Sequence, residues 1–337
     1  MIVGMDTLSE ILRAVKLQGA LFFNGEFSAP WCFRSGRPAS TAPLAEFLAT
    51  PSAHGSDMGH LIIFHLLTEG RGYARLQDGE RYELNAGDIV ILPHGDPHFI
   101  GNGSPEKPVD SFVVFAKSLA RGLRVTRFGG GGEITRFVCG FMACDPRLSE
   151  VFLAGLPPIF KVNVSSEPSG QWLAHSIRFS VDHAVGSSAG SNLVVSKLAE
   201  VLFIEALRRY ISTMPPKQTG WLAGARDPFV GQALAHLHKQ PAHPWTITDL
   251  AKRAGTSRTR LVARFRHYLS ESPMGYLTRW RLKLGEEMLQ SAGETVAAVA
   301  AAVGYGSEAS YNRAFKREFG IPPASYRRKQ SVPRSHR

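Results

Sequence analysis

The feature that most constrains the fold of this 337-residue chain is an internal repeat in its last third. Gly255 is matched by Gly304 after 49 residues, and Phe265 is matched by Phe315 after 50 residues. One additional turn residue in the second copy accounts for the difference between the two offsets. Because both copies carry the same pattern, we expect the segment to fold as two similar helical units.

Each copy predicts a helix, a tight turn and a second helix. The first helices are expected over Ile247–Ala254 and Val296–Val303, and each is followed by a glycine, which can adopt the left-handed backbone that ends a helix. Ser257 and Ser307 stand where an N-cap would begin the second helix. This is the helix–turn–helix pattern, whose second helix enters the major groove of DNA.

The second helix of each copy is expected to bury one face and leave the other free for DNA. Leu261 and Phe265 in the first copy, and Tyr311 and Phe315 in the second, lie four residues apart and so share a face. The residues on the opposite faces are candidates to contact bases: Arg258, Thr259, Val262, Ala263, Glu308, Ala309, Ser310 and Arg313.

Arg313 is the strongest candidate for base recognition, because its guanidinium can pair with both O6 and N7 of guanine. Glu308 could accept a hydrogen bond from cytosine N4, or it could only complement the helix dipole. Val262 and Ala263 offer at most contact with thymine methyl groups, so we expect the first copy to read sequence weakly.

A second group of basic side chains is expected to contact DNA phosphates, which supply affinity without sequence information. For each of them, a solvated surface charge is the alternative. These candidates are Arg260, Arg264, Arg266, Lys316 and Arg317.

A long helix is expected over Met274–Leu289, where it would hold the two units apart. A separation of roughly 34 Å, one turn of duplex, would let both second helices enter successive major grooves. The segment from about Asp227 to Tyr326 resembles the DNA-binding domain of AraC/XylS-type transcription regulators, most closely over residues 303–327. The outward-facing positions match that family's base-contacting positions. The resemblance implies sequence-specific binding of promoter DNA, with RNA polymerase as a further partner.

The positive charge of the chain is concentrated in the same segment. Residues 226–337 contain 19 Lys and Arg against 8 Asp and Glu, whereas residues 1–225 contain 20 of each, so the last third carries the whole net charge of +11. Such an asymmetry indicates a nucleic-acid-binding module joined to a neutral partner. A merely solvated basic surface is the alternative that composition alone leaves open.

Before the repeat, short apolar runs separated by Gly, Asp and Pro predict an antiparallel barrel or sandwich. The expected strands are Leu61–Leu67, Gly72–Leu76, Asp88–Leu92 and Ser111–Phe115. The segment Gly87–Asn102 resembles the second cupin motif at every defined position. The resemblance implies a cupin-like barrel with His98 pointing into it.

The first cupin motif is only partly present, because Ile63 occupies a place where that motif has a histidine. The remaining candidates for a Zn²⁺ or Fe²⁺ site are His65, Glu69 and His98, with Glu26 or His60 as a fourth ligand. The same side chains could instead form a satisfied polar cluster without a metal.

Three cysteines are too few for a disulfide scaffold and are typical of a cytoplasmic protein. Cys139 lies in an apolar strand pattern, Phe137–Phe141. It is a candidate redox sensor, and a buried structural thiol is the alternative. No run of eighteen apolar residues is present, so no membrane span is expected.

We therefore expect an α+β multi-domain protein, with an N-terminal cupin-like β-barrel with helices and a C-terminal all-α domain of two helix–turn–helix units. The expected divisions are a sensor domain at 1–190, a helix at 191–211, a Pro- and Gly-containing linker at 212–226 and the DNA-binding domain at 227–330. The apolar stripe of the helix at 191–211 could pack on its own barrel or pair with a second subunit, and the resemblance favours a homodimer.

These observations favour a cytoplasmic, sequence-specific transcription regulator whose barrel senses a small molecule, a metal or an oxidant. A metal-dependent cupin enzyme with a DNA-binding appendage is the alternative, and Ile63 in a ligand position argues against it. An architectural DNA-binding protein without a sensor is a third hypothesis, and the cavity-forming cupin motif argues against that one.

Overall fold

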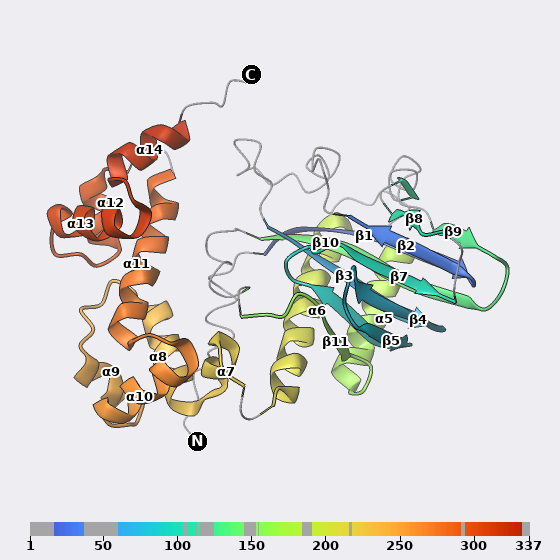
Figure 1. The fold of residues 1–337 in the computed structure, drawn as a ribbon, viewed down its shortest axis with the longest axis horizontal. Coiled ribbons are helices and arrows are strands. Elements are labelled where there is room, and N and C mark those ends of the chain that lie inside the picture. The colour runs from blue at the N-terminus through green and yellow to red at the C-terminus, as the bar shows by residue number, and fades with distance from the viewer. Residues whose placement is uncertain are drawn as a thin grey trace. The chain divides into compact units, whose positions relative to one another are not determined.

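The computed structural model describes residues 17–36, 60–103, 107–111, 113–114, 125–144, 153, 155–183, 191–215, 218–290 and 294–331 (Figure 1). The chain forms two compact units; the described strands all lie in one of them, and the labelled elements of the other are all helices. Among the described residues, no helix is long and apolar enough to cross a membrane.

The first unit contains all of the described strands. These are β1 (Leu17–Ser28), β2 (Trp31–Ser35), β3 (His60–Glu69), β4 (Arg71–Leu76), β5 (Arg81–Asn85), β6 (Asp88–Leu92), β7 (His98–Asn102), β8 (Val109–Asp110), β9 (Thr126–Gly129), β10 (Ile134–Cys144) and β11 (Phe160–Asn163). Two helices follow them, α5 (Pro168–His183) and α6 (Ser191–Thr213).

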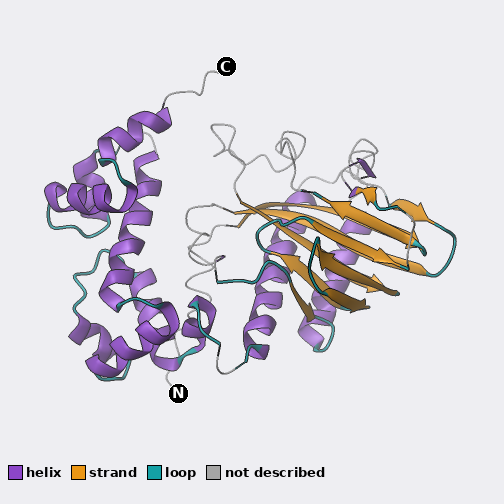
Figure 2. Ribbon diagram, viewed as in Figure 1, coloured by secondary structure: helices purple, strands orange, loops and turns teal. Residues whose placement is uncertain are grey.

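The strands form two sheets (Figure 2). One sheet has the order β11–β6–β3–β10–β1–β9, and the other has the order β5–β4–β7–β2–β8. Neighbouring strands are antiparallel, except that β9 runs parallel to β1 and β8 runs parallel to β2. The expected cupin-like architecture of strands with helices is confirmed.

The strand expected over Ser111–Phe115 is wrong. The strand β8 ends at Asp110, and the described residues Ser111, Val113 and Val114 are helical. A short apolar run does not by itself distinguish a strand from a helix, and no alternation of polar residues was available here to decide between them.

The core of the first unit lies between the two sheets and is rich in aromatic rings. The ring centroid of Phe27 lies 4.8 Å from that of Trp31 and 4.8 Å from that of Phe33, and Trp31 meets the ring of Phe137 edge-on at 5.7 Å. These residues come from strands of both sheets and are all buried. Their packing joins the two layers, since buried aromatic side chains contribute large apolar areas.

The strand β3 is buried on both faces. Ile63 and Leu67 belong to the core between the sheets, while Phe64 and Leu66 are fully buried on the opposite face. Helices α5 and α6 pack on this sheet along β1, β3 and β11. Coverage of both faces explains why this strand is almost continuously apolar.

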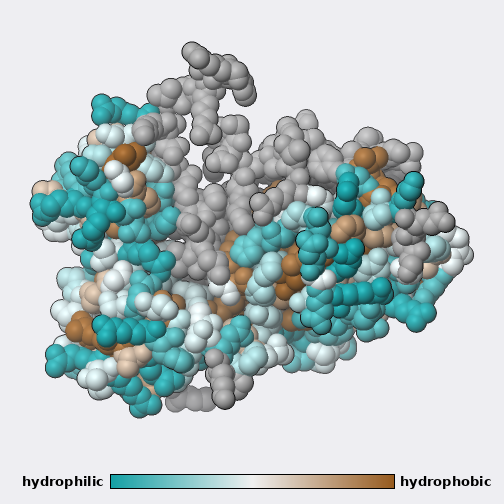
Figure 3. Space-filling view, viewed as in Figure 1, coloured by the Kyte–Doolittle hydropathy of each residue, from teal (hydrophilic) through white to brown (hydrophobic). Residues whose placement is uncertain are grey.

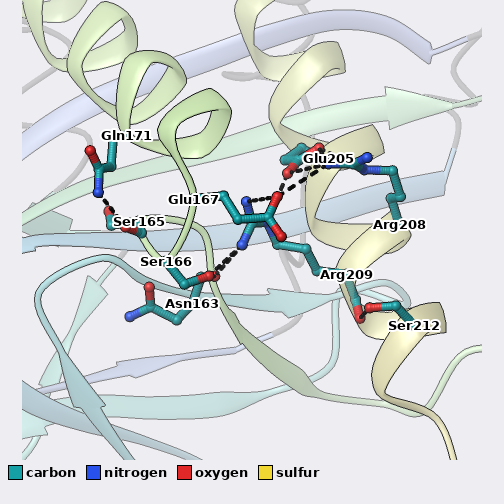
Figure 4. Close-up of polar contacts among 9 residues, drawn as sticks. All are labelled: Asn163, Ser165, Ser166, Glu167, Gln171, Glu205, Arg208, Arg209 and Ser212. Atoms are coloured by element: carbon teal, nitrogen blue, oxygen red, sulfur yellow. Dashed lines mark hydrogen bonds and ion pairs between the residues drawn. The ribbon is translucent and has the colours of Figure 1, made fainter.

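Arg209 of α6 forms hydrogen bonds and ion pairs with the turn between β11 and α5 (Figure 4). Its guanidinium donates to the Asn163 carbonyl at 3.1 Å, to the Ser166 hydroxyl and to the carboxylates of Glu167 and Glu205. The Arg209 side chain is only 10% exposed. The helix expected over 191–211 therefore packs on its own barrel through its inner face.

The second unit is a set of helices joined by short turns. They are α7 (Trp221–Arg226), α8 (Pro228–Lys239), α9 (Ile247–Arg253), α10 (Arg258–Leu269), α11 (Pro273–Gln290), α12 (Val296–Ala302), α13 (Glu308–Phe319) and α14 (Pro323–Ser331). The repeat and the long central helix expected from the sequence are confirmed, with α9–α10 as the first copy and α12–α13 as the second.

Side-chain caps start the helices of both copies. The hydroxyls of Thr246 and Thr295 accept from backbone N–H groups at the starts of α9 and α12, and those of Ser257 and Ser307 do the same for α10 and α13. Each cap satisfies a donor that the helix itself leaves unpaired. The two predicted serine caps are therefore confirmed.

The turn glycines adopt the left-handed backbone that the repeat requires. The backbone φ angle is 67° at Gly255 and 87° at Gly304. A Cβ atom at Gly304 would lie 2.6 Å from the backbone of Ala242, so this position excludes a side chain on steric grounds as well.

The segment 212–226, expected to be a linker, is helical over much of its length. Helix α6 extends to Thr213, and α7 covers residues 221–226. Trp221 is buried and donates from Nε1 to the Tyr276 hydroxyl at 2.9 Å. Short helices depend on tertiary packing, here against α8 and α10, and composition therefore did not indicate this one.

We expect Trp221→Ala to destabilise the second unit by about 3–5 kcal/mol, because it removes a buried ring and leaves the Tyr276 hydroxyl short of a donor. Lys239→Ala, an exposed substitution at the end of α8, is the matched control. The measurement is denaturant unfolding followed by far-UV circular dichroism. Equal stability of the two variants would show that α7 is dispensable to the unit.

Candidate DNA-binding interface and barrel interior

The second helices of the two copies, α10 and α13, are called the recognition helices below. They bury the faces predicted from the sequence. Leu261, Phe265, Tyr311 and Phe315 have no exposed surface. Phe265 packs on Tyr276 of α11, and Phe315 packs on Tyr326 of α14, with ring centroids 6.2 and 5.5 Å apart. Each recognition helix is thus anchored by one face only.

The candidate base-contacting residues lie on the opposite, solvent-facing sides. Arg258, Thr259, Ala263, Glu308, Ala309 and Arg313 are exposed, and Val262 and Ser310 are half-buried. The Ser310 hydroxyl donates to the Ser307 carbonyl at 2.7 Å, so it is partly occupied in the cap of α13. The viewed surface over α10 and α13 is mainly hydrophilic (Figure 3).

Four of the candidate phosphate-contacting residues are exposed on the same two helices. They are Arg260, Arg266, Lys316 and Arg317. The guanidinium of Arg260 lies over the ring of Phe229, 4.6 Å from its centroid, which limits the orientations of this side chain.

Arg264 differs from these four residues, because a carboxylate of the same unit engages its guanidinium. Its Nε donates to the Asp227 carboxylate at 2.7 Å, and a second guanidinium nitrogen contacts the same oxygen. Asp227 also caps α8 by accepting from the N–H groups of Phe229 and Val230. Burial alone raises the pKa of Asp227, but the hydrogen bonds from Arg264 and from these two N–H groups outweigh it and lower the pKa. The Asp227–Arg264 pair joins α10 to the start of α8 and so fixes the orientation of α10.

Two further positioning groups could not be identified from the sequence. Arg281 of α11 donates to the backbone carbonyls of Pro241 and His243, both at 2.7 Å, and so fixes the loop before α9. Tyr276 joins His238 to Trp221 through its hydroxyl. Their partners lie 38 to 55 residues away, so no local pattern marks them.

Inside the barrel of the first unit, two of the predicted metal ligands meet. The Nε2 atoms of His65 and His98 lie 2.8 Å apart, and both side chains are buried. The other ring nitrogen of His65, Nδ1, lies 2.9 Å from the Cys139 sulfur. His98 Nδ1 lies 2.9 Å from the Asp96 carbonyl oxygen. The cysteine was predicted separately from the histidines, and the structure brings them together because Cys139 pairs directly with His65 between β10 and β3.

Glu69 does not join the two histidines, contrary to the prediction. The register between β10 and β3 shifts between Arg136 and Phe137, which leaves Thr68 as an additional residue in β3. Because side chains alternate between the two faces of a strand, one additional residue turns the side chains beyond it to the opposite face. The Glu69 side chain is accordingly 53% exposed and forms an ion pair with Arg136.

The alternative fourth ligands do not complete the site either. Glu26 forms ion pairs with Arg127 and Arg136, which lower its pKa through their hydrogen bonds. The side chain of His60 lies outside the described residues. Within the described ranges, no group of three His, Cys, Asp or Glu side chains is arranged to hold a metal ion. Cys139 and His98 contact opposite nitrogens of the His65 ring, so these three side chains could not all be ligands of one Zn²⁺ or Fe²⁺ ion.

Burial keeps these groups neutral. It lowers the pKa of His98 to about 4, despite the opposing hydrogen bond to the Asp96 carbonyl. It also lowers the pKa of His65 well below the usual value, and it raises the pKa of the Cys139 thiol.

The His98 pKa makes the stability of the first unit dependent on pH. Between pH 6.5 and about 4 the unfolded chain binds a proton at this side chain that the folded chain does not, so the free energy of unfolding falls as the pH is lowered through this range. The contribution of His98 levels off about one pH unit above 6.5, and its loss reaches roughly 3 kcal/mol at the lower end. Urea unfolding at pH 7.5 and pH 4.5 measures the difference, and we expect His98→Gln to reduce it. An unchanged difference in the variant would exclude His98 as its source.

Two family models match the chain. Residues 6–212 match a model described as cupin, and residues 250–329 match one described as a helix-turn-helix domain. The first match covers more than half of the chain.

Similar proteins span both units. A putative AraC-like transcription regulator of Streptomyces lividans is 35% identical over 268 residues, which cover 78% of this chain and 86% of that protein. The regulator AlkR of Acinetobacter baylyi is 29% identical over 329 residues, 96% and 99% of the two chains. The RCS-specific activator RclR of Escherichia coli is 26% identical over 324 residues, 96% and 97% of the two chains. These relatives are named as transcription regulators and not as enzymes. The chain belongs to the AraC-type family of DNA-binding transcription regulators, with an N-terminal cupin domain.

Proposed function

We propose that α10 and α13 enter the major groove of promoter DNA and that α13 supplies most of the discrimination between bases. The observation that carries this proposal is Arg313, which is exposed on the free face of a helix held rigidly by Tyr311 and Phe315. Among the described residues, no hydrogen bond or ion pair occupies its guanidinium. On α10 the position that corresponds to Arg313 is Ala263, and neither it nor Val262 offers polar readout, which leaves Arg258 and Thr259 as the polar side chains of that face.

In this proposal the other exposed basic residues of the two helices contact phosphates. Arg260 and Arg266 flank the free face of α10, and Lys316 and Arg317 follow Arg313 on α13. Such contacts supply affinity on any sequence and depend strongly on salt. Arg264 is left out of this set because Asp227 holds it.

We expect Arg313→Ala to weaken binding to a preferred site by about 1–3 kcal/mol, because a paired contact with guanine is lost. Binding to random DNA should change little. The preferred site is obtained by selection from random duplexes with the unaltered protein, and affinities are measured by fluorescence anisotropy at several salt concentrations.

Lys316→Ala, on the same helix, is the matched control. It should weaken binding to preferred and random duplexes equally and reduce the slope of log K against log salt by about 0.9. If Arg313→Ala weakened binding to preferred and random duplexes equally, Arg313 would contact phosphate and would not read the base sequence.

The cupin unit is proposed to sense a signal in the cytoplasm and to change how the regulator engages its promoter and RNA polymerase. The chemistry of its interior supports a small molecule or an oxidant better than a metal, because Glu69 and Glu26 are engaged by arginines. The same observation disfavours a metal-dependent cupin enzyme.

We further propose that the protein is a homodimer that pairs through the outer faces of α5 and α6. Large apolar side chains are exposed on both helices: Trp172, Phe179, Val194, Val201 and Ile204. The two helices pack against one another, so these side chains lie on one outer layer of the first unit. Clustered exposed apolar side chains mark interaction surfaces, and a dimer would double the DNA contacts.

Val201→Asp should shift the protein towards the monomer, because a charge would be buried at the interface. Sedimentation equilibrium measures the dimer dissociation constant, and we expect an increase of at least about tenfold, corresponding to roughly 1.4 kcal/mol. Gln77→Asp, in the exposed turn after β4, is the control for the added charge. An unchanged dissociation constant for Val201→Asp would place the interface elsewhere.

A further inference from the structure

A cavity of about 180 Å³ lies in the first unit, outside the barrel interior. Its walls are formed by the last residues of β3, by Gly87 in the turn before β6, by Ser165 in the turn before α5, and by one face of α5. Because a water molecule takes up about 30 Å³ in the liquid, this volume corresponds to about six waters and is smaller than a pocket for a drug-sized ligand. The cavity therefore has room for a small molecule only.

Gly87 determines the base of the cavity. Its N–H donates to the Leu67 carbonyl and its own carbonyl accepts from the Val164 N–H, both at 2.8 Å. Its backbone φ angle is 90°, and a Cβ atom would lie 2.6 Å from the Cβ atom of Ser165. Only glycine therefore lets the turn that carries Ser165 lie this close to the turn before β6.

One face of α5 supplies polar side chains to the cavity. Gln171, His175 and Arg178 lie four and then three residues apart, so they share this face. Gln171 has a structural contact, since its Nε2 donates to the Ser165 carbonyl at 2.9 Å (Figure 4). Among the described residues, no hydrogen bond or ion pair engages the side chains of His175 and Arg178 or the hydroxyl of Ser165.

The charge of the lining favours an anion. No carboxylate is among the described residues that line the cavity. The neighbouring carboxylates already have cationic partners, Arg136 for Glu69 and Lys161 for the buried Asp88. An unpaired guanidinium, an imidazole N–H and a hydroxyl can all donate to an oxyanion, and an imidazole keeps at least one N–H in either protonation state.

We propose that this cavity binds a small organic carboxylate, with Arg178 as the residue that pairs with it and with Ser165 and His175 as further donors. A carboxylate is specified because a guanidinium can pair with both of its oxygens and because one cation then balances one charge. A phosphate would bring nearly two charges to the same cation. The proposal rests on the sensing role proposed above for the cupin unit, and the signal then binds outside the barrel interior.

The occupied cavity should act on the dimer surface proposed above, because both involve α5. Gln171 precedes Trp172 and Arg178 precedes Phe179, so two residues of the cavity wall have direct neighbours on the dimer surface. A ligand held by Arg178 and Ser165 joins α5 to the turn before it and limits the motion of the helix. We expect a tighter dimer when the cavity is occupied, since α5 is then ordered before the subunits associate.

Titration of the full-length protein with sodium acetate, followed by the Nε–H resonance of Arg178 in ¹H–¹⁵N spectra, tests the binding site. Sodium chloride keeps the ionic strength constant, and inorganic phosphate and methylammonium are titrated in parallel. We expect a saturable shift with acetate, a weaker response to phosphate and none to methylammonium. Tighter binding of phosphate than of acetate, or an acetate response without saturation, would overturn the proposal.

Two variants and a control locate the bound acetate, with the Ser165 amide resonance as the reporter. Arg178→Gln should weaken binding at least about tenfold, because a hydrogen bond between two charged groups is lost. Ala174→Leu removes no charge but fills part of the cavity, so it should weaken binding as well. Arg81→Gln, at the end of β5 away from Gly87, is the control for the lost charge and should leave binding unchanged.

Undiminished binding in Arg178→Gln would place acetate elsewhere and contradict the assignment of the cavity. This substitution is on the surface, so it decides the question even if Ala174→Leu does not fold, which far-UV circular dichroism shows.

The effect on the dimer has its own readout. Sedimentation equilibrium with saturating acetate should give a lower dimer dissociation constant for the unaltered protein and no change for Arg178→Gln. Acetate binding without any change in this constant would exclude the cavity as the site of the signal. These measurements involve neither DNA nor Val201, so their failure is distinguishable from failure of the proposed promoter recognition or dimer surface.

Discussion

The DNA-binding unit depends on one constraint, namely that each recognition helix buries a single face. Tyr311 and Phe315 of α13 pack with residues of α11, α12 and α14, and Leu261 and Phe265 play the same part for α10. Because one face is fixed by the core, the other is presented to solvent with a defined set of side chains. Caps, turn glycines and the Asp227–Arg264 pair then set where each helix begins and how it is oriented.

The barrel of the first unit uses polar groups in a different way. Most of its interior is apolar and aromatic, and the buried His65, His98 and Cys139 are compatible with it only because each donor meets an acceptor. A chain of this kind has one low-energy arrangement of protons, which fixes the orientation of both imidazole rings. Glu69 and Glu26 lie outside this chain, because arginines engage both carboxylates.

The parts of the fold that could be predicted from the sequence are those determined by local chemistry. Serine caps, left-handed glycines and buried apolar residues four apart depend on neighbours within a few positions, and all three predictions agree with the structure. The cupin architecture followed from a motif whose residues are also local.

The features that the sequence did not indicate depend on distant partners. The ion pair of Arg264 with Asp227 joins residues 37 positions apart, so no local pattern indicated it. Glu69 was expected in a metal site because the bulge at Thr68 arises from pairing with β10. Helix α7 was missed because Trp221 is stabilised by Tyr276 and not by its own neighbours. The juxtaposition of Cys139 with His65 likewise required the register between β10 and β3.

The central claim is that two recognition helices on one rigid unit read neighbouring turns of the same DNA face. Hydroxyl-radical footprinting on a selected duplex tests it most directly. Each protomer should protect two patches about 10 base pairs apart on one face, since adjacent major grooves recur with that period, so the proposed dimer should protect two such pairs. A single patch for each protomer, or paired patches on opposite faces, would contradict it.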